Sequence, residues 1–95
     1  MKAFMIEREL PEIGLADSTE LAAAAEKSNA ALAQLGPRIQ WQHSYITGDR
    51  TFCLYLAEDE EAILEHARIS GFPATRITAI TGRIDPTTAG RSASA

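Results

Sequence analysis

One short stretch of this 95-residue chain gathers most of the side chains that could do chemistry. Residues 39–56 predict two strands joined by a tight turn at residues 47–50. Because successive side chains of a strand point to opposite faces, the stretch has one aliphatic face and one aromatic face. The aromatic face also carries a histidine and the only cysteine, and its members are Trp41, His43, Tyr45, Cys53 and Tyr55.

The two histidines are the natural candidates for a metal ligand or a general base. His66 lies in the apolar stripe of a predicted helix, where the usual histidine is buried, hydrogen-bonded and structural. His43 belongs to a strand, where it is either an interface residue or a surface metal ligand. We expect the two on opposite sides of the sheet, so that a site using both needs a strand end or a second subunit.

Cys53 and Glu7 are weaker candidates. A lone cysteine behaves mostly as a small buried hydrophobe, and no sequence neighbour of Cys53 favours its reactive thiolate. Glu7 is the only carboxylate predicted on the aromatic face. We expect it to pair with a tyrosine, with Trp41 or with an arginine such as Arg83, because an isolated buried carboxylate is costly. If unpaired in a dry pocket, it could act as a general base.

The elements that must position these residues follow the order βαββαβ. The first strand spans residues 2–9. Asp17 and Glu20 have the spacing of a capping box before a helix at residues 18–35, which Gly36 and Pro37 end. After the hairpin, acidic residues 58–61 suit the first turn of a helix at residues 59–70, and a last strand follows at residues 76–81.

This order predicts an α+β, ferredoxin-like domain over residues 1–84. Right-handed crossovers give the antiparallel strand order 4-1-3-2, with both helices on one face. Small polar residues 85–95 have nothing to bury, and we predict a flexible C-terminal tail. The residues predicted to face the helices are apolar: Phe4, Ile6, Ile46, Phe52, Leu54, Leu56 and Ile80.

The opposite, open face of the sheet is then predicted to be rich in aromatics. Its expected members are Met5, Glu7, Trp41, His43, Tyr45, Cys53, Tyr55 and Ala79. A contiguous apolar patch of this kind marks an interface or a ligand groove. The simplest cover is a second copy packed about a two-fold axis, which makes a homodimeric α+β barrel or sandwich.

Composition excludes several classes of protein. The net charge is −4, and the nine basic residues form no stripe of the kind that nucleic-acid binders carry. One cysteine allows no internal disulfide, so an oxidising compartment is not implied. No apolar run is long enough for a membrane span. We therefore expect a cytoplasmic protein with neither nucleic acid nor membrane as partner.

The chain also resembles a small bacterial family of ferredoxin-like proteins, mostly of unknown function, that includes a nickel-binding, nickel-responsive member. The resemblance covers residues 2–88 and rests on residues 4–9, 36–41, 44–47, 53–55, 59–63, 65–67, 71–73 and 84–88, among them Glu65-His66-Ala67 and Gly71-Phe72-Pro73. It implies a ferredoxin-like homodimer, divalent-metal binding and a role in nickel sequestration. Imidazole suits nickel, which makes His43 and His66 the obvious nitrogen ligands.

Three hypotheses about function follow. The first is a homodimeric protein that binds or sequesters a divalent metal, nickel first. The second is a cofactor-free enzyme or small-molecule binder of the dimeric α+β barrel type, with Glu7 or His66 as base. Its pocket would lie on the open face, lined by Glu7, Trp41, Tyr45, Cys53 and Tyr55. The third is an interaction module without chemistry, and we favour a binding protein over an enzyme.

Overall fold

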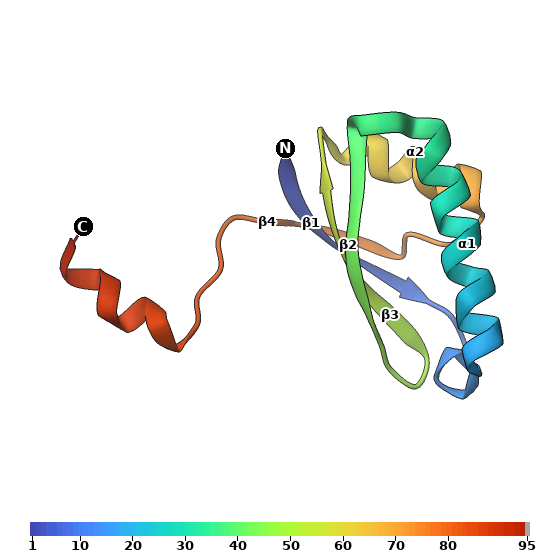
Figure 1. Cartoon of the computed structure of the whole chain (residues 1–95), viewed down its shortest axis with the longest axis horizontal. Helices are drawn as coiled ribbons and strands as arrows, with labels where there is room; N and C mark the ends of the chain where they lie inside the picture. Colours follow the sequence, from blue (N-terminus) through green and yellow to red (C-terminus); the bar gives the residue numbers. More distant parts are fainter. Residues whose placement is uncertain (95) are drawn as a thin grey trace.

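Four antiparallel strands form one layer of the fold and two helices form the other (Figure 1). The computed structural model describes the backbone of residues 1–94 and the side chains of residues 1–90. The elements in chain order are β1 (Lys2–Glu9), η1 (Ile13–Leu15), α1 (Ser18–Leu35), η2 (Gly36–Arg38), β2 (Ile39–Ile46), β3 (Arg50–Ala57), α2 (Glu60–Ser70), β4 (Arg76–Ile80) and η3 (Pro86–Ser94).

The strand order in the sheet is β2-β3-β1-β4, which confirms the predicted ferredoxin-like topology. Each neighbouring pair is antiparallel. Both helices cover the same face of the sheet (Figure 1). The other face, which we call the open face, is covered by neither α1 nor α2 (Figure 1).

Local chemistry sets the ends of both helices. At the start of α1 the Asp17 carboxylate accepts a hydrogen bond from the Glu20 backbone N–H at 2.8 Å, and the Glu20 carboxylate accepts one from the Asp17 backbone N–H. The predicted capping box is therefore confirmed. Asp59 caps α2 by accepting from the Ala62 N–H at 2.9 Å. Gly71 ends α2 with a positive φ of 79°, a conformation that glycine adopts without a Cβ penalty.

The prediction for the two faces of β3 was wrong. Phe4 and Ile6 of β1 face the helices as expected, but they stand opposite Tyr55 and Cys53. Directly opposite residues of an antiparallel pair share a face, so Cys53 and Tyr55 lie under the helices, 4% and 2% exposed. Both faces of β3 are apolar, so alternation alone cannot choose between them, and a one-residue change of register exchanges them.

The open face consequently holds Phe52, Leu54 and Leu56, which the sequence had placed in the core, whereas Ile46 pairs with Thr51 on the helix side as predicted. Met5, Glu7 and Ala3 of β1 stand opposite Leu54, Phe52 and Leu56 of β3. In β4 the prediction was also reversed. Ile80 pairs with the open-face residue Ala3, whereas Ala79 pairs with Phe4.

A β-bulge at Gln42 separates two residues that strict alternation had put together. Trp41 stands opposite Tyr55, but His43 stands opposite Leu54. The extra residue shifts the alternation of side chains by one position, so that residues 41 and 43 face opposite sides of the sheet. Trp41 therefore joins the helix side of the sheet, and His43 and Tyr45 remain on the open face.

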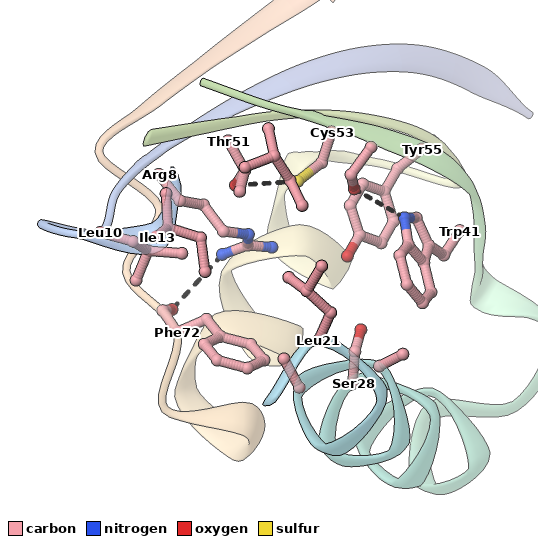
Figure 2. Close-up of a pocket in the computed structure, with 14 residues that line it drawn as sticks. Arg8, Leu10, Ile13, Leu21, Ser28, Trp41, Thr51, Cys53, Tyr55 and Phe72 are labelled. Carbon is pink, nitrogen blue, oxygen red and sulfur yellow. Dashed lines mark hydrogen bonds between the residues drawn. The ribbon is translucent and has the colours of Figure 1, made fainter. Parts of the chain in front are cut away.

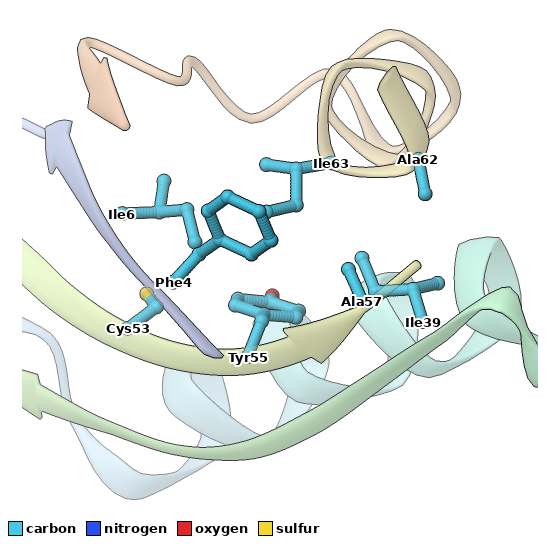
Figure 3. Packing of buried hydrophobic residues seen from close by; sticks show 8 residues of the cluster. All are labelled: Phe4, Ile6, Ile39, Cys53, Tyr55, Ala57, Ala62 and Ile63. Atoms are coloured by element: carbon cyan, nitrogen blue, oxygen red, sulfur yellow. The ribbon is translucent and has the colours of Figure 1, made fainter. Parts of the chain in front are cut away.

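The core lies between the sheet and α2 (Figure 3). Its buried members come from three strands and one helix: Phe4, Ile6, Ile39, Cys53, Tyr55, Ala57, Ala62 and Ile63. The sequence predicted an inner stripe of α2 made of Ala62, Ile63, His66, Ala67 and Ser70; all of these are buried except Ala67, which is half-buried.

The C-terminal segment forms a 3-10 helix, η3, where the sequence had predicted no regular structure. Asp85 starts it by accepting a hydrogen bond from the Thr87 N–H at 2.9 Å. Figure 1 shows η3 standing apart from the two layers. Flexibility of residues 85–95 stays a prediction, and position 95 lies outside the described residues. Among the helices described, none is both long and apolar enough to cross a membrane.

Candidate functional site

A buried arginine lies on the helix side of the sheet, near the end of β1. Arg8 follows Phe4 and Ile6 at two-residue spacing along β1, and it is only 3% exposed. Its Nη1 donates to the Pro73 carbonyl oxygen at 2.7 Å and to that of Phe72 at 3.4 Å. Arg8 thereby fastens the loop between α2 and β4 to the first strand.

His66 continues the polar cluster from Arg8 to α1. Its Nδ1 lies 3.5 Å from Arg8 Nη2, and its Nε2 lies 3.1 Å from the Ser28 hydroxyl. Since a guanidinium only donates, Nδ1 must accept, which assigns the proton to Nε2 and makes that nitrogen the donor to Ser28. The prediction of a buried, hydrogen-bonded histidine is confirmed, as its exposure is 0%.

Burial first, and then the positive charge of Arg8, lower the pKa of His66 from 6.5 to about 4, against a smaller opposing effect of the hydrogen bond with Ser28. The imidazole is therefore neutral at neutral pH. A base so reluctant to take a proton, with its free lone pair already facing a cation, is poorly suited to general base catalysis. The second role proposed for it from sequence, a metal ligand, would require a divalent cation beside a guanidinium.

Tyr55 forms the floor of the same cluster. Its ring lies 5.4 Å from the His66 ring, and the Arg8 guanidinium stands 5.9 Å above its centroid, within cation–π range. Burial raises the pKa of Tyr55 above its ordinary value, an effect that Arg8 and Ser28 oppose. The phenol is therefore protonated and serves as a hydrogen-bonding group.

A cavity of about 320 Å³ opens beside this cluster, between α1 and the sheet (Figure 2). Most of its lining is apolar and comes from the loop after β1, from α1 and from β2: Leu10, Ile13, Leu21, Ala24, Ala25 and Ile46. Figure 2 shows the Arg8 guanidinium and the hydroxyls of Tyr55 and Ser28 directed toward its middle. A volume of this size falls at the lower end of the range of small-molecule pockets.

Three of the residues predicted to line a pocket or a dimer face do line this cavity, although on the helix side. They are Trp41, Cys53 and Tyr55. Trp41 donates from Nε1 to the Ser44 hydroxyl at 2.9 Å. The Cys53 sulfur lies 3.4 Å from the Thr51 hydroxyl and is buried, in keeping with the structural reading of a lone cysteine.

The other two, Glu7 and Tyr45, lie on the open face and away from the cavity. Glu7 is 3.5 Å from Arg50 Nη1 and 4.0 Å from Arg76 Nε. The prediction that an arginine would pair with Glu7 is confirmed, but the partners are Arg50 and Arg76. A carboxylate held between two cations is not the unpaired base that the enzyme hypothesis required.

The sequence prediction did not identify Arg8 and Ser28 as polar residues of the site. The signal for Arg8 was present, because strict alternation from Phe4 and Ile6 puts residue 8 on the same buried face. An arginine on a core face is uncommon unless its charge is used.

The potential metal ligands of the described residues lie apart from one another. The described residues contain no group of three or more His, Cys, Asp or Glu side chains that could hold a metal ion. Both ring nitrogens of His66 are engaged, and Cys53 is buried. His43 is exposed and makes an edge contact with the Tyr45 ring at 5.1 Å, so it is the histidine that can receive a metal ion from solution.

A family model described as nickel responsive protein SCO4226-like matches residues 4–80. The crystal structure of SCO4226 from Streptomyces coelicolor A3(2) is similar with a TM-score of 0.72 and 16% identity, over 86% of this chain and 99% of that one. At this identity the structural likeness concerns the fold. Among curated proteins, none matches.

Proposed function

Because the chain belongs to the nickel responsive protein SCO4226-like family, we propose that it is a homodimer that binds nickel(II) and thereby sequesters it. Family membership over residues 4–80 is the observation that carries the proposal. The sequence prediction of a cytoplasmic protein fits this role.

The open face supports the homodimer. Its centre is a patch of half-buried aliphatic and aromatic side chains, made of Met5, Phe52, Leu54, Leu56 and Ile80. Tyr45, which is 61% exposed, lies at the edge of this patch. An antiparallel sheet that meets water on one face usually carries polar residues there. An apolar patch of this kind favours burial against a second copy through an isologous contact, in which the same surface serves both subunits.

The dimer also resolves the shortage of ligands. One subunit offers His43 as its accessible imidazole, and the described residues of one subunit hold no ready ligand cluster. An isologous contact across the open face doubles every ligand on it, so that two His43 side chains belong to one interface. We therefore assign the nitrogen ligands to His43 of both subunits, with carboxylates supplying oxygen ligands, and we exclude His66.

Calorimetric titration with nickel(II) tests the metal. We expect saturable binding by the wild type, a loss of at least tenfold in affinity for His43→Ala, about 1.4 kcal/mol, and unchanged affinity for His66→Ala if that variant folds. No heat with wild-type protein at sub-millimolar nickel, or equal affinity in the His43 variant, contradicts the proposal.

Sedimentation equilibrium tests the dimer. Leu54→Glu puts a charge at the centre of the open face and is expected to give a monomer. Leu64→Glu is the matched control, since Leu64 lies on α2, is already 51% exposed and is remote from the open face. A wild-type monomer, or a Leu54→Glu variant that sediments as the wild type does, removes the open face as the dimer interface.

A further inference from the structure

The cationic cluster beside the cavity has no role in the nickel proposal, and it raises a separate question about charge. Arg8 is 3% exposed, and a buried charge is costly unless it is paired. Within the described residues, no aspartate or glutamate forms an ion pair with Arg8. Its contacts are two carbonyl oxygens, a neutral imidazole nitrogen and the face of a tyrosine ring.

The donors of Arg8 are only partly used by these contacts. An arginine carries five N–H donors, and its hydrogen bonds reach the carbonyls of Phe72 and Pro73 and the Nδ1 of His66. All three acceptors are neutral, so the positive charge of the guanidinium is left without a counter-charge. The same guanidinium lines the cavity, where an anion can reach it.

The lining of the cavity away from Arg8 favours an apolar ligand body. Apart from Arg8 and the hydroxyls of Ser28, Tyr55 and Thr51, its walls are made mostly of aliphatic and aromatic side chains. Ile46, which belongs to the lining, is 46% exposed, so that the cavity reaches the surface there. An apolar body with one anionic group fits this distribution of charge.

We infer that the cavity binds a small amphipathic monocarboxylate, with its carboxylate on the Arg8 guanidinium and its hydrocarbon body along α1. A guanidinium and a carboxylate form two parallel hydrogen bonds, the strongest pairing available to an arginine. The Tyr55 and Ser28 hydroxyls are directed toward the same space (Figure 2) and can donate to the same carboxylate. This inference does not depend on nickel or on the open face.

Trp41 supplies the readout, since it is the only tryptophan of the chain and lines the cavity. Purified wild-type protein is titrated in EDTA with decanoate, decanol and decylammonium, which share one hydrocarbon chain and differ in charge. We expect saturable changes in Trp41 emission with decanoate and affinity for decanol lower by about tenfold or more, the ratio typical of a lost charged hydrogen bond. Decylammonium should not bind.

Two variants on α1 test the position of the ligand without changing Arg8. Ala25→Phe fills the cavity while leaving Arg8 in place. Ala22→Phe is its control on the same helix, because Ala22 is exposed and does not line the cavity. We expect decanoate binding to be lost in the first and kept in the second.

Two results would overturn the inference. The first is equal affinity for decanoate and decanol, which would mean that Arg8 does not read the charge. The second is decanoate binding by Ala25→Phe as tight as that by Ala22→Phe, which would place the ligand elsewhere. Because EDTA removes metal, neither result bears on the nickel proposal.

Discussion

The buried histidine makes stability depend on pH in a way that one substitution should remove. In the folded protein the pKa of His66 is about 4, whereas its ordinary value is 6.5. As the pH falls below 6.5, the unfolded chain takes up a proton at this residue and the folded chain does not. Protonation therefore favours unfolding, and the stabilisation present above pH 6.5 is lost as the pH approaches 4.

The size of the effect follows from the two pKa values of His66. At about pH 5.5 the histidine is roughly 90% protonated when unfolded and roughly 3% protonated when folded. Linkage then predicts that the free energy of unfolding falls by about 1.2 kcal/mol between about pH 7 and about pH 5.5 because of this residue alone. Most carboxylates titrate below this window, which makes it the cleanest place to look.

The assay is urea unfolding of wild type, His66→Gln and His43→Gln at both pH values. Glutamine does not titrate, so the unfolding free energy of His66→Gln should lack the fall of about 1.2 kcal/mol between the two pH values, even though this variant is less stable at both. His43→Gln removes the exposed histidine and should keep the wild-type slope. A His66→Gln variant with the wild-type slope would refute the account of His66 as a buried, neutral group.

Three further substitutions test the scaffold. Gly14→Ala should cost about 2 kcal/mol of unfolding free energy, because its Cβ would lie 2.8 Å from the backbone of Gly48. The control is Gly82→Ala, whose Cβ meets nothing within 4 Å and which should change the unfolding free energy by less than about 0.5 kcal/mol. Equal costs for the two variants would contradict the packing of the loop after β1 on the hairpin turn. Asp59→Ala should cost about 1 kcal/mol through loss of the α2 cap, seen as a lower urea midpoint, and an unchanged midpoint would show that the cap contributes nothing. Glu7→Gln should cost less than about 1 kcal/mol in low salt and still less in 1 M salt, whereas a cost that salt leaves unchanged would exclude an electrostatic origin.

Local sequence signals predicted the secondary structure because each one acts over a few residues. The capping pair Asp17 and Glu20, the acidic start of α2 and the glycine at its end place the helices. Strand alternation with a turn at residues 47–50 places the hairpin. The βαββαβ order then restricts the topology, since right-handed crossovers leave one arrangement of the sheet.

The faces of the strands could not be read in the same way. Along β3 both sets of alternating residues are apolar, so the pattern permits either face to meet the helices. Only pairing with β1 decided that Cys53 and Tyr55 go inward and Leu54 outward. In β2 the bulge at Gln42 moved Trp41 and His43 apart, and a bulge leaves no reliable signal in a single sequence.

The candidate site shows the same division. The sequence by itself identified the residue types that could act, found His66 on an inner helical stripe and pointed to an uncovered apolar sheet face. Tertiary structure alone decided that Arg8, His66 and Ser28 meet, although they are separated by as many as 58 positions along the chain, and that a cavity opens beside them. The reason is physical: helix and turn preferences are local free energies, whereas register, burial of a charge and the shape of a cavity depend on which distant segments pack together.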